Sequence, residues 1–268
     1  MSSASKSQSA GSPLQTVDRA LAVLLSFTAR RSEWGVTELA EEFGFDKSSA
    51  QRLLAALAAR GFLSVDEITH RYRLGPAVWR IASSWERRGG MAMLVNPLLA
   101  ELADATMRTA VFTLADGAYL RCVAAVDGGH VSMRDHPLVG EVYPAHAGAT
   151  SRAYFAFLPK GQRESLIYRG PLARFSKLTE LDPVAIEAEM AKTSEAGWAY
   201  SEGEYDVNTR AVAAPVMVGA QPIGSVSVGE RKNDPVDDIL DHVEAVQETA
   251  KKIGMLLSHP THRKPSGT

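Results

Sequence analysis

The sequence has little cysteine, no long apolar run and almost no net charge. Cys122 is the single cysteine among 268 residues, which excludes an intramolecular disulfide framework and a cysteine-rich zinc site. A lone thiol fits the reducing cytoplasm. No stretch has the length of a transmembrane span or the form of a secretory signal, so we expect no membrane partner. These absences favour a cytoplasmic protein.

Compact catalytic and metal-binding motifs are also missing. None of the seven histidines belongs to a signature such as HExxH, and there is no GxSxG elbow. Cys122 stands between apolar residues of an expected strand, where a thiol is usually inert core. The sequence therefore predicts no catalytic residue, no metal site and no cofactor, and it favours a protein that is not an enzyme.

Length and composition predict two domains between polar ends. We expect residues 1–13, which are rich in serine, and residues 259–268 to be disordered tails. Between them we expect a DNA-binding domain over 14–75, a linking helix over 76–90 and a second domain over 91–258. Up to Gly90 the chain has 12 Lys and Arg against 9 Asp and Glu, and beyond it 17 against 22. The first part is the basic one, as phosphate binding requires.

Two short amphipathic helices joined by a tight turn are predicted within residues 36–61. Gly44 ends the first, because a left-handed residue after a helix is cheapest for glycine. Asp46 suits the N-cap of the second, where a short acceptor side chain meets free amide groups. The apolar residues that we expect to face inward are Leu39, Ala40, Phe43, Ala50, Leu53, Leu54, Leu57 and Ala58. The opposite side of the second helix carries donors and no acid: Lys47, Ser48, Gln51 and Arg52.

A β-hairpin follows, with strands expected at 62–65 and 72–74. Helix pairs joined through glycine are common, so the helices alone also fit a small scaffold with a solvated basic face. A hairpin that ends in Arg71 favours a winged helix-turn-helix, whose second helix meets base edges in the major groove. We expect Ser48, Ser49 and Gln51 to read bases, and Lys47, Arg52 and Arg71 to hold phosphates.

Helices are also predicted on both sides of this module. The first covers residues 17–29 after a Thr16 cap and packs under the helix pair, with Val17, Leu21 and Leu25 among its buried residues. Trp34 is expected to fill the small core of this module. The second begins at Pro76 and carries an apolar stripe with no domain of its own to cover it: Val78, Trp79, Ile81, Ala82 and Trp85. Such a stripe usually contacts a partner, so we predict a dimer that places two winged modules side by side.

The second domain reads as an α+β sensor domain with an antiparallel sheet. The predicted helices cover 97–107, 147–158 and 183–196, and a long one begins at Asp234-Pro235. The predicted strands cover 109–114 and 118–126 around an Asp-Gly turn, 131–134, 211–218 and 223–228. The acidic run 202–206 is expected to be a flexible, solvated loop over the ligand pocket of this domain.

Several separated motifs, in order, resemble the IclR family of transcriptional regulators from Gln15 to Leu257. They are QTVDRALAVLLSF, VTELAEEFGFDKSSAQRLLAALAARGFL, RYRLGPAVWRIA, PAHAGATSRAYFAFLP, GWAYSEGE and AVAAPV. The resemblance implies an α+β protein: an N-terminal winged helix-turn-helix domain, a linking helix and a C-terminal GAF-like effector-binding domain. It also implies a double-stranded DNA operator, a small-molecule effector, and a homodimer or dimer of dimers.

The resemblance points to an effector pocket at His146, Ala147, Gly148, Ala149, Ser201, Ala211, Ser225 and Ser227. A small-residue loop that enters a helix can hold a carboxylate through free backbone amides. Ser225 and Ser227 alternate with valines and share one side of a strand, which could equally face solvent. Relatives that bind small oxoacids use a cysteine or polar group where this chain has Ala211. A more apolar pocket for a larger or aromatic ligand is expected, with Met133, Tyr154 and Phe155 as walls or as core.

Two departures from the family lie near this expected pocket. Asn208-Thr209 stands where glycine is common, and Val228-Gly229-Glu230 replaces a common Ser-Gly-Pro run. The effector is therefore not transferable from a relative. We predict a sequence-specific regulator whose operator affinity depends on an organic acid or aromatic effector. The alternatives are an enzyme acting on a small carboxylate with a fused DNA module, and a constitutive DNA-binding protein without effector.

Overall fold

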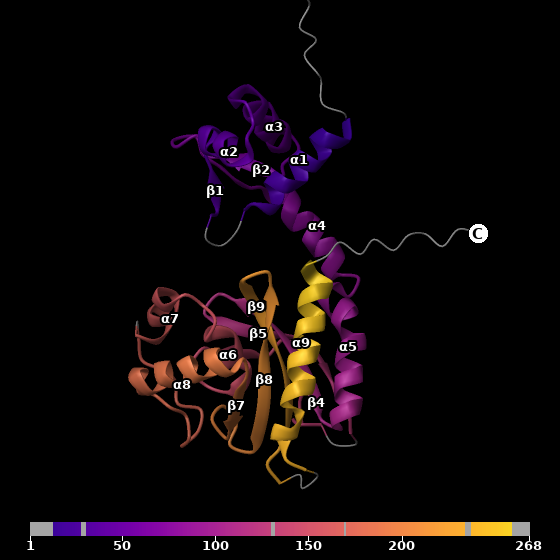
Figure 1. Cartoon of the computed structure of the whole chain (residues 1–268), viewed down its shortest axis with the longest axis vertical. Helices are drawn as coiled ribbons and strands as arrows, with labels where there is room; N and C mark the ends of the chain where they lie inside the picture. The colour runs from indigo at the N-terminus through magenta and orange to yellow at the C-terminus, as the bar shows by residue number, and fades with distance from the viewer. Residues whose placement is uncertain (1–12, 28–30, 130–131, 169, 234–236, 259–268) are drawn as a thin grey trace, which may run out of the picture. The chain divides into compact units, whose positions relative to one another are not determined.

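The computed structural model describes residues 13–27, 31–129, 132–168, 170–233 and 237–258 (Figure 1). The predicted tails, apart from Pro13, lie outside these residues. The chain divides into two compact units, Met1–Gly89 and Gly90–Thr268, and each is described by itself. No helix in the described ranges is long and apolar enough to cross a membrane.

The first unit is a winged helix-turn-helix. Its three strands form an antiparallel sheet in the order β1-β3-β2, so the predicted hairpin is present and gains a short third strand. The elements are α1 (Pro13–Leu25), β1 (Glu33–Trp34), α2 (Val36–Phe43), α3 (Lys47–Ala59), β2 (Leu63–Val65), β3 (Tyr72–Leu74) and α4 (Pro76–Glu86).

The turn between α2 and α3 forms as predicted. Gly44 ends α2 in the left-handed conformation, with φ of 64°. Asp46 caps α3 by accepting a hydrogen bond from the Ser49 amide at 2.8 Å. Trp34, Leu39 and Leu54 are at most 2% exposed and fill the core under both helices, as expected.

The prediction for α1 is wrong in its position and in its buried face. The helix begins at Pro13 and ends at Leu25. Val17 and Leu21 are each 54% exposed and Leu25 is 81% exposed. The small core, already filled by Trp34, contacts α1 through the adjoining side, where Val23 is fully buried. The predicted stripe is real in the sequence, but no surface of this chain's first unit covers it.

The second unit is a six-stranded antiparallel sheet between two helical layers (Figure 1). The strand order is β6-β5-β4-β9-β8-β7. The elements are α5 (Gly90–Thr106), β4 (Thr109–Asp116), β5 (Tyr119–Val126), β6 (Val142–Pro144), α6 (Ala149–Phe155), α7 (Lys160–Ile167), α8 (Pro183–Ala196), β7 (Ala199–Glu202), β8 (Thr209–Val218), β9 (Gln221–Arg231), a 3-10 turn η1 (Ile239–His242) and α9 (Val243–Ser258). The predicted α+β class is confirmed.

Residue alternation along the strands builds a separate core on each face of the sheet. Phe112 and Val226 belong to the core under α5 and α9, whereas Val111 belongs to the core under α6, α7 and α8. Cys122 is 1% exposed in that second core, and burial raises the pKa of its thiol to about 12. It is inert core, as predicted.

Several boundaries differ from the prediction because long-range packing overrides local signals. α5 begins at Gly90 and contains Pro97, since burial of Val95 and its neighbours against the sheet offsets the one hydrogen bond that proline removes. α9 begins at Val243 after η1, whereas the predicted start at Asp234-Pro235 lies outside the described residues. Residues 132–134 are not a strand, and Val131 lies outside the described residues. We did not predict β6, α7 or β7 from the sequence.

Candidate functional site

The exposed side of α3 presents the donors that the sequence predicted. Lys47, Ser48, Gln51 and Arg52 are exposed, and Ser49 is half-buried. The Ser48 hydroxyl donates to the Asp46 carboxylate at 2.6 Å, and the Ser49 amide donates to it at 2.8 Å. These hydrogen bonds hold the pKa of Asp46 well below its ordinary value. The cap therefore stays ionised and fixes the first turn of α3.

Gln51 connects α3 to the wing. Its Nε2 donates to the Tyr72 hydroxyl at 3.1 Å, while Tyr72 is 5% exposed in β3. The side-chain carbonyl of Gln51 accepts no hydrogen bond from the described part of the chain, so it can accept from a ligand. This contact orients one predicted base-reading side chain against a buried residue.

Arg71 lies between the wing strands, as predicted, and its side chain is paired with carboxylates. The Asp66 amide donates to the Arg71 carbonyl at 2.9 Å, which closes the hairpin and leaves Arg71 at the base of its tip. The Arg71 guanidinium makes two hydrogen bonds to the Glu38 carboxylate, at 2.7 and 3.2 Å, and its Nε lies 2.7 Å from Glu33. Arg71 is thus held by two carboxylates and ties the wing to α2. A phosphate contact by this side chain stays a prediction.

The predicted stripe on α4 stays uncovered within its own unit. Trp79 is 70% exposed, Ile81 is 58% exposed and Trp85 is 38% exposed. Ala82 is also exposed, and Val78 is half-buried. An exposed apolar patch of this kind is typical of a surface that contacts a partner.

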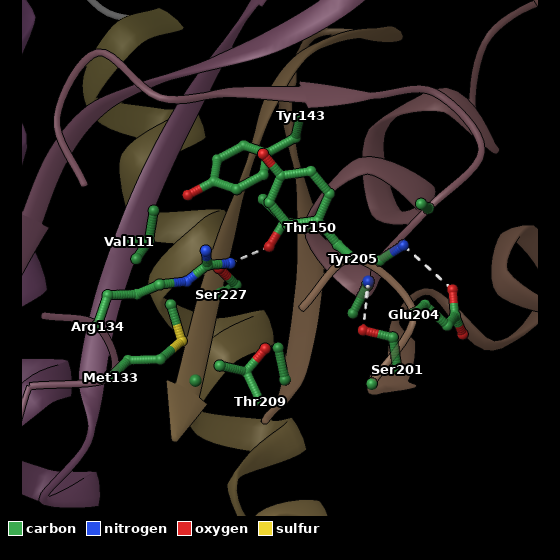
Figure 2. A pocket seen from close by; sticks show the side chains of 16 residues that line it. Val111, Met133, Arg134, Tyr143, Thr150, Ser201, Glu204, Tyr205, Thr209 and Ser227 are labelled. Carbon is green, nitrogen blue, oxygen red and sulfur yellow. Dashed lines mark hydrogen bonds between the residues drawn. The ribbon is translucent and has the colours of Figure 1, made fainter. Parts of the chain in front are cut away.

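A cavity in the second unit lies between the N-terminus of α6, the ends of β8 and β9, and the segment 133–134 (Figure 2). Its volume in the structure is ≈ 40 Å³, well below the roughly 300–1,000 Å³ of small-molecule sites. Six of the eight residues predicted for the effector line it: Ala147, Gly148, Ala149, Ser201, Ala211 and Ser227. The two segments in which the chain departs from the family also line the cavity, through Thr209 and Gly229.

Two of the backbone amides at the start of α6 are already bound to side chains. The Gly148 amide donates to Glu204 Oε2 at 3.1 Å, and the Ala149 amide donates to the Ser201 hydroxyl at 2.7 Å (Figure 2). Arg152 Nη2 pairs with the same Glu204 oxygen at 2.5 Å. The chain's own carboxylate therefore occupies the position where a ligand anion was expected.

The serines of β9 lie under α6 and not in solvent. Ser227 is 3% exposed, lines the cavity and lies 3.1 Å from the Thr150 hydroxyl. Ser225 is fully buried beneath the cavity, where its hydroxyl donates to the Thr150 carbonyl at 2.8 Å. Ser225 and Ser227 share one side of the strand, as predicted, but only Ser227 lines the cavity.

Three other predicted positions lie outside the cavity. His146 is 7% exposed, and its Nε2 lies 2.8 Å from the Ala173 carbonyl, so it anchors a neighbouring segment. Tyr154 and Phe155 belong to the core under α6. Met133 does line the cavity, and it fills the space beside Gly229, where an added Cβ would lie 2.2 Å from its sulfur.

Arg134 and two tyrosines form the wall opposite α6 (Figure 2). The Arg134 guanidinium lies 5.3 Å from the centre of the Tyr205 ring, and the Tyr143 and Tyr205 rings meet edge to face at 5.3 Å. Both tyrosine hydroxyls donate to Glu141, at 3.1 and 3.2 Å. Burial first, and then the Glu141 charge, raise the pKa of Tyr205 to about 12 and that of Tyr143 further. The wall therefore offers a cation, two neutral rings and their hydroxyls.

Sequence reasoning missed Arg134, and it placed Glu204 and Tyr205 over the pocket but not in its wall. The run 202–206 was expected to be solvated, yet Gly203 is buried and the residues from Glu204 to Asp206 are half-buried against the cavity. The one available signal was an aromatic residue and a glycine inside an acidic run, which is unusual for a solvated loop. Within the described ranges, no three His, Cys, Asp or Glu side chains converge as metal ligands would.

Comparison with known proteins assigns both units to described families. The chain matches the family "Bacterial transcriptional regulator IclR C-terminal" over residues 88–255 and "IclR helix-turn-helix domain" over residues 16–67. It is 28% identical over 204 residues to the HTH-type transcriptional regulator BhcR of Paracoccus denitrificans, covering 76% of this chain and 72% of that protein. It is 25% identical over 250 residues to the Pca operon regulatory protein of Acinetobacter baylyi, covering 90% and 88%.

Solved structures agree with the fold. An IclR-family regulator from Rhodococcus has a TM-score of 0.68 at 21% identity, covering 95% of this chain and 98% of that chain. An IclR homologue from Microbacterium hydrocarbonoxydans, complexed with 4-hydroxybenzoate, has a TM-score of 0.57 at 20% identity, covering 90% and 98%. At these identities the likeness shows the fold alone.

Proposed function

The chain belongs to the IclR family of bacterial transcriptional regulators, and we propose that a small organic acid or aromatic effector, bound in the cavity of the second unit, sets its affinity for a DNA operator. The observation that carries the DNA half is the exposed side of α3, where a fixed N-cap presents Lys47, Gln51 and Arg52 away from the core. Such a regulator acts in the cytoplasm, where the chromosome is.

The roles on α3 follow from the contacts of each side chain. Gln51 is held by Tyr72 through its amide nitrogen, so its carbonyl is free to accept from a base amino group. Ser48 and Ser49 lie beside it in the first turn and contribute to base readout. Lys47 and Arg52 hold phosphates, which position the helix without reading sequence. Arg71 positions the wing through Glu38, and its phosphate contact stays a prediction.

The cavity supports the effector half of the proposal. Its lining combines apolar and aromatic side chains with a few convergent polar groups, as small-molecule sites do. One IclR homologue of the same fold is complexed with 4-hydroxybenzoate, and the name of another relative refers to the pca operon. An organic acid or aromatic ligand is consistent with both. A ligand that binds one dimer geometry more tightly than another shifts the population toward operator-competent or operator-incompetent protein.

A homodimer supplies the second recognition helix. Trp79 and Ile81 on α4 are uncovered, and so are Leu21 and Leu25 on α1 of the same unit. A second copy would bury these apolar surfaces and place two α3 helices for two half-sites. Trp79→Glu should dissociate the dimer in sedimentation velocity at micromolar concentration and weaken operator binding. A wild-type chain that sediments as a monomer contradicts this part of the proposal.

The decisive experiment is selection of duplexes from a random library by the full-length protein at physiological ionic strength. The selected sequence should bind at least about 10³-fold more tightly than random duplex. Gln51→Ala should lose preference at one base pair while a surface variant of the second unit, Lys192→Ala, keeps it. No enrichment of any sequence would contradict the proposed function.

A further inference from the structure

One cation that lines the cavity, Arg134, lacks a full set of hydrogen bonds. The inference drawn from it rests on the proposed function, because it concerns the effector. We propose that the Arg134 guanidinium is the receptor for an effector carboxylate. The ligand then lies with its acid group on the wall opposite α6, and its apolar body extends toward Met133, Ala147 and Ala211.

The first step is that two amides at the start of α6, those of Gly148 and Ala149, are not free to receive an anion. Gly148 and Ala149 each donate to a side chain of the second unit, Glu204 and Ser201. Glu204 is 18% exposed on its side chain and pairs with Arg152, which is 11% exposed. A ligand carboxylate at this point would have to displace a largely buried ion pair and would face its negative charge.

The second step is that Arg134 is buried without adequate partners. Its side chain is 11% exposed, and its two ion pairs, to Glu141 and Asp206, are both 3.4 Å long. Charge-assisted hydrogen bonds between such groups are normally about 2.7–2.9 Å. The Arg134 Nε is buried, and its 3.4 Å contact with Asp206 Oδ2 lacks the geometry of a hydrogen bond. A buried donor in this condition is expected to meet a ligand or an ordered water.

The third step is that the two neighbouring carboxylates have other donors. Glu141 accepts from the hydroxyls of Tyr143 and Tyr205, and Asp206 accepts from the Asn208 amide at 2.9 Å. Arg134 can therefore turn toward a ligand while both carboxylates keep a hydrogen bond. Figure 2 shows its side chain reaching into the cavity below the tyrosine rings.

The remaining lining restricts the class of ligand. The tyrosine rings and small aliphatic side chains favour a flat or branched apolar body, and the hydroxyls of Thr209 and Ser227 lie among them. A single carboxylate matches the one guanidinium among the described lining residues, because a fork of N–H donors binds a carboxylate through two parallel hydrogen bonds. The predicted class is a monocarboxylate with an aromatic or comparable apolar body that carries a hydroxyl group.

Isothermal titration of the full-length protein with acids and their matched carboxamides tests the proposal. The probes are benzoate, 4-hydroxybenzoate and phenylacetate, each against its own amide. The wild-type protein should bind at least one acid about 10- to 100-fold more tightly than the amide. Arg134→Gln should abolish this difference by weakening the binding of the acid while the binding of the amide stays unchanged. Arg134→Lys should restore the difference in part. Arg121→Gln, an exposed arginine paired with Asp116 outside the cavity, should behave as wild type.

Two outcomes would overturn the proposal. One is that Arg134→Gln, with an unchanged melting temperature, still prefers the acid. The other is that no acid in the set binds the wild-type protein more tightly than its amide. Either result leaves the proposed function standing if the protein selects an operator and a ligand alters that binding. Conversely, loss of operator selection with an intact Arg134-dependent acid preference would contradict the function and keep this inference.

Discussion

The Glu204 carboxylate accepts a hydrogen bond from the Gly148 amide at 3.1 Å, across the mouth of the cavity. Two segments that are 56 residues apart in sequence meet there, and Arg152 holds the same oxygen. Glu204 acts as a built-in anion at the N-terminus of α6. The cavity is consequently organised before any ligand enters, and its geometry depends on this one side chain.

Removing that carboxylate should destabilise the second unit. Glu204→Ala leaves the largely buried Arg152 guanidinium and the Gly148 amide without their acceptor. The expected loss is ~1–3 kcal/mol in the free energy of unfolding, measured by urea denaturation. Glu189→Ala removes an exposed partner of Lys192 on α8 and should change stability by under ~0.5 kcal/mol. Equal effects of the two substitutions would show that Glu204 is only a surface residue.

A side chain at position 148 should be poorly tolerated. Gly148 has φ of 93° and ψ of 152°, a region that residues other than glycine rarely adopt, and its Cβ position lies 3.5 Å from the Tyr205 Cβ. Gly148→Ala should lower the free energy of unfolding by ~1–3 kcal/mol. Gly161→Ala provides the matched control, because Gly161 lies in α7 with open space around it and should gain up to ~1 kcal/mol. An unchanged free energy of unfolding in Gly148→Ala would contradict backbone strain at this position.

Local signals in the sequence predicted a large part of the fold. Asp182 and Gly197 bracket α8 as predicted, and Gly44 and Asp46 bracket the turn before α3, because caps act within a few residues. The α5 boundary failed because packing against the sheet outweighed the signal at Pro97. Local patterns carry no information on how much core is available to cover a helix, so they also misplaced the buried face of α1.

The candidate site was predictable where a motif lies on one segment. The small-residue loop at Ala147–Ala149 and Ser227 line the cavity as expected. Arg134 and Glu204 could not be found in this way, since their roles depend on contacts with residues many positions away. His146 belongs to the expected motif, yet its ring turns toward Ala173. A motif places the backbone of a site better than it places each side chain.

The contact between Gln51 and Tyr72 should matter for specificity more than for stability. Gln51→Ala should cost about 1–3 kcal/mol in operator binding and relax preference at one base pair. Tyr72→Phe keeps the buried ring and removes the hydroxyl that orients Gln51, so it should relax the same position to a smaller extent. Fluorescence anisotropy with operator duplexes that carry each single substitution measures both. Unchanged preference in Gln51→Ala would remove this residue from base readout.

Lys47 should contribute a phosphate contact that shows in the salt dependence. Lys47→Ala should weaken all duplexes alike and flatten the slope of log affinity against log salt by about one unit. Lys192→Ala removes the same charge from the exposed surface of α8, where it pairs with Glu189, and should leave the slope unchanged. A slope that does not differ between the two variants would contradict the phosphate assignment.

The ion pair between Arg71 and Glu38 should make the stability of the first unit depend on pH. Hydrogen bonds from Arg71, and then from the Gly35 amide, lower the pKa of Glu38 below its ordinary value of 4.5. A lowered pKa in the folded state stabilises the protein above the unfolded value, and this contribution disappears as the pH falls through the folded value. Thermal midpoints should therefore fall on acidification below about pH 4.5.

The Arg71→Met variant isolates this contribution. It should melt below wild type at pH 7, and the difference should shrink on acidification below pH 4.5, because protonated Glu38 no longer favours Arg71. Tryptophan fluorescence follows the unit, since Trp34, Trp79 and Trp85 lie in it and only Trp198 does not. Arg121→Met, which loses an exposed pair with Asp116 in the second unit, should leave the melting of the first unit as in wild type at each pH. If Arg71→Met and wild type keep the same separation at every pH, the pair does not couple the wing to α2.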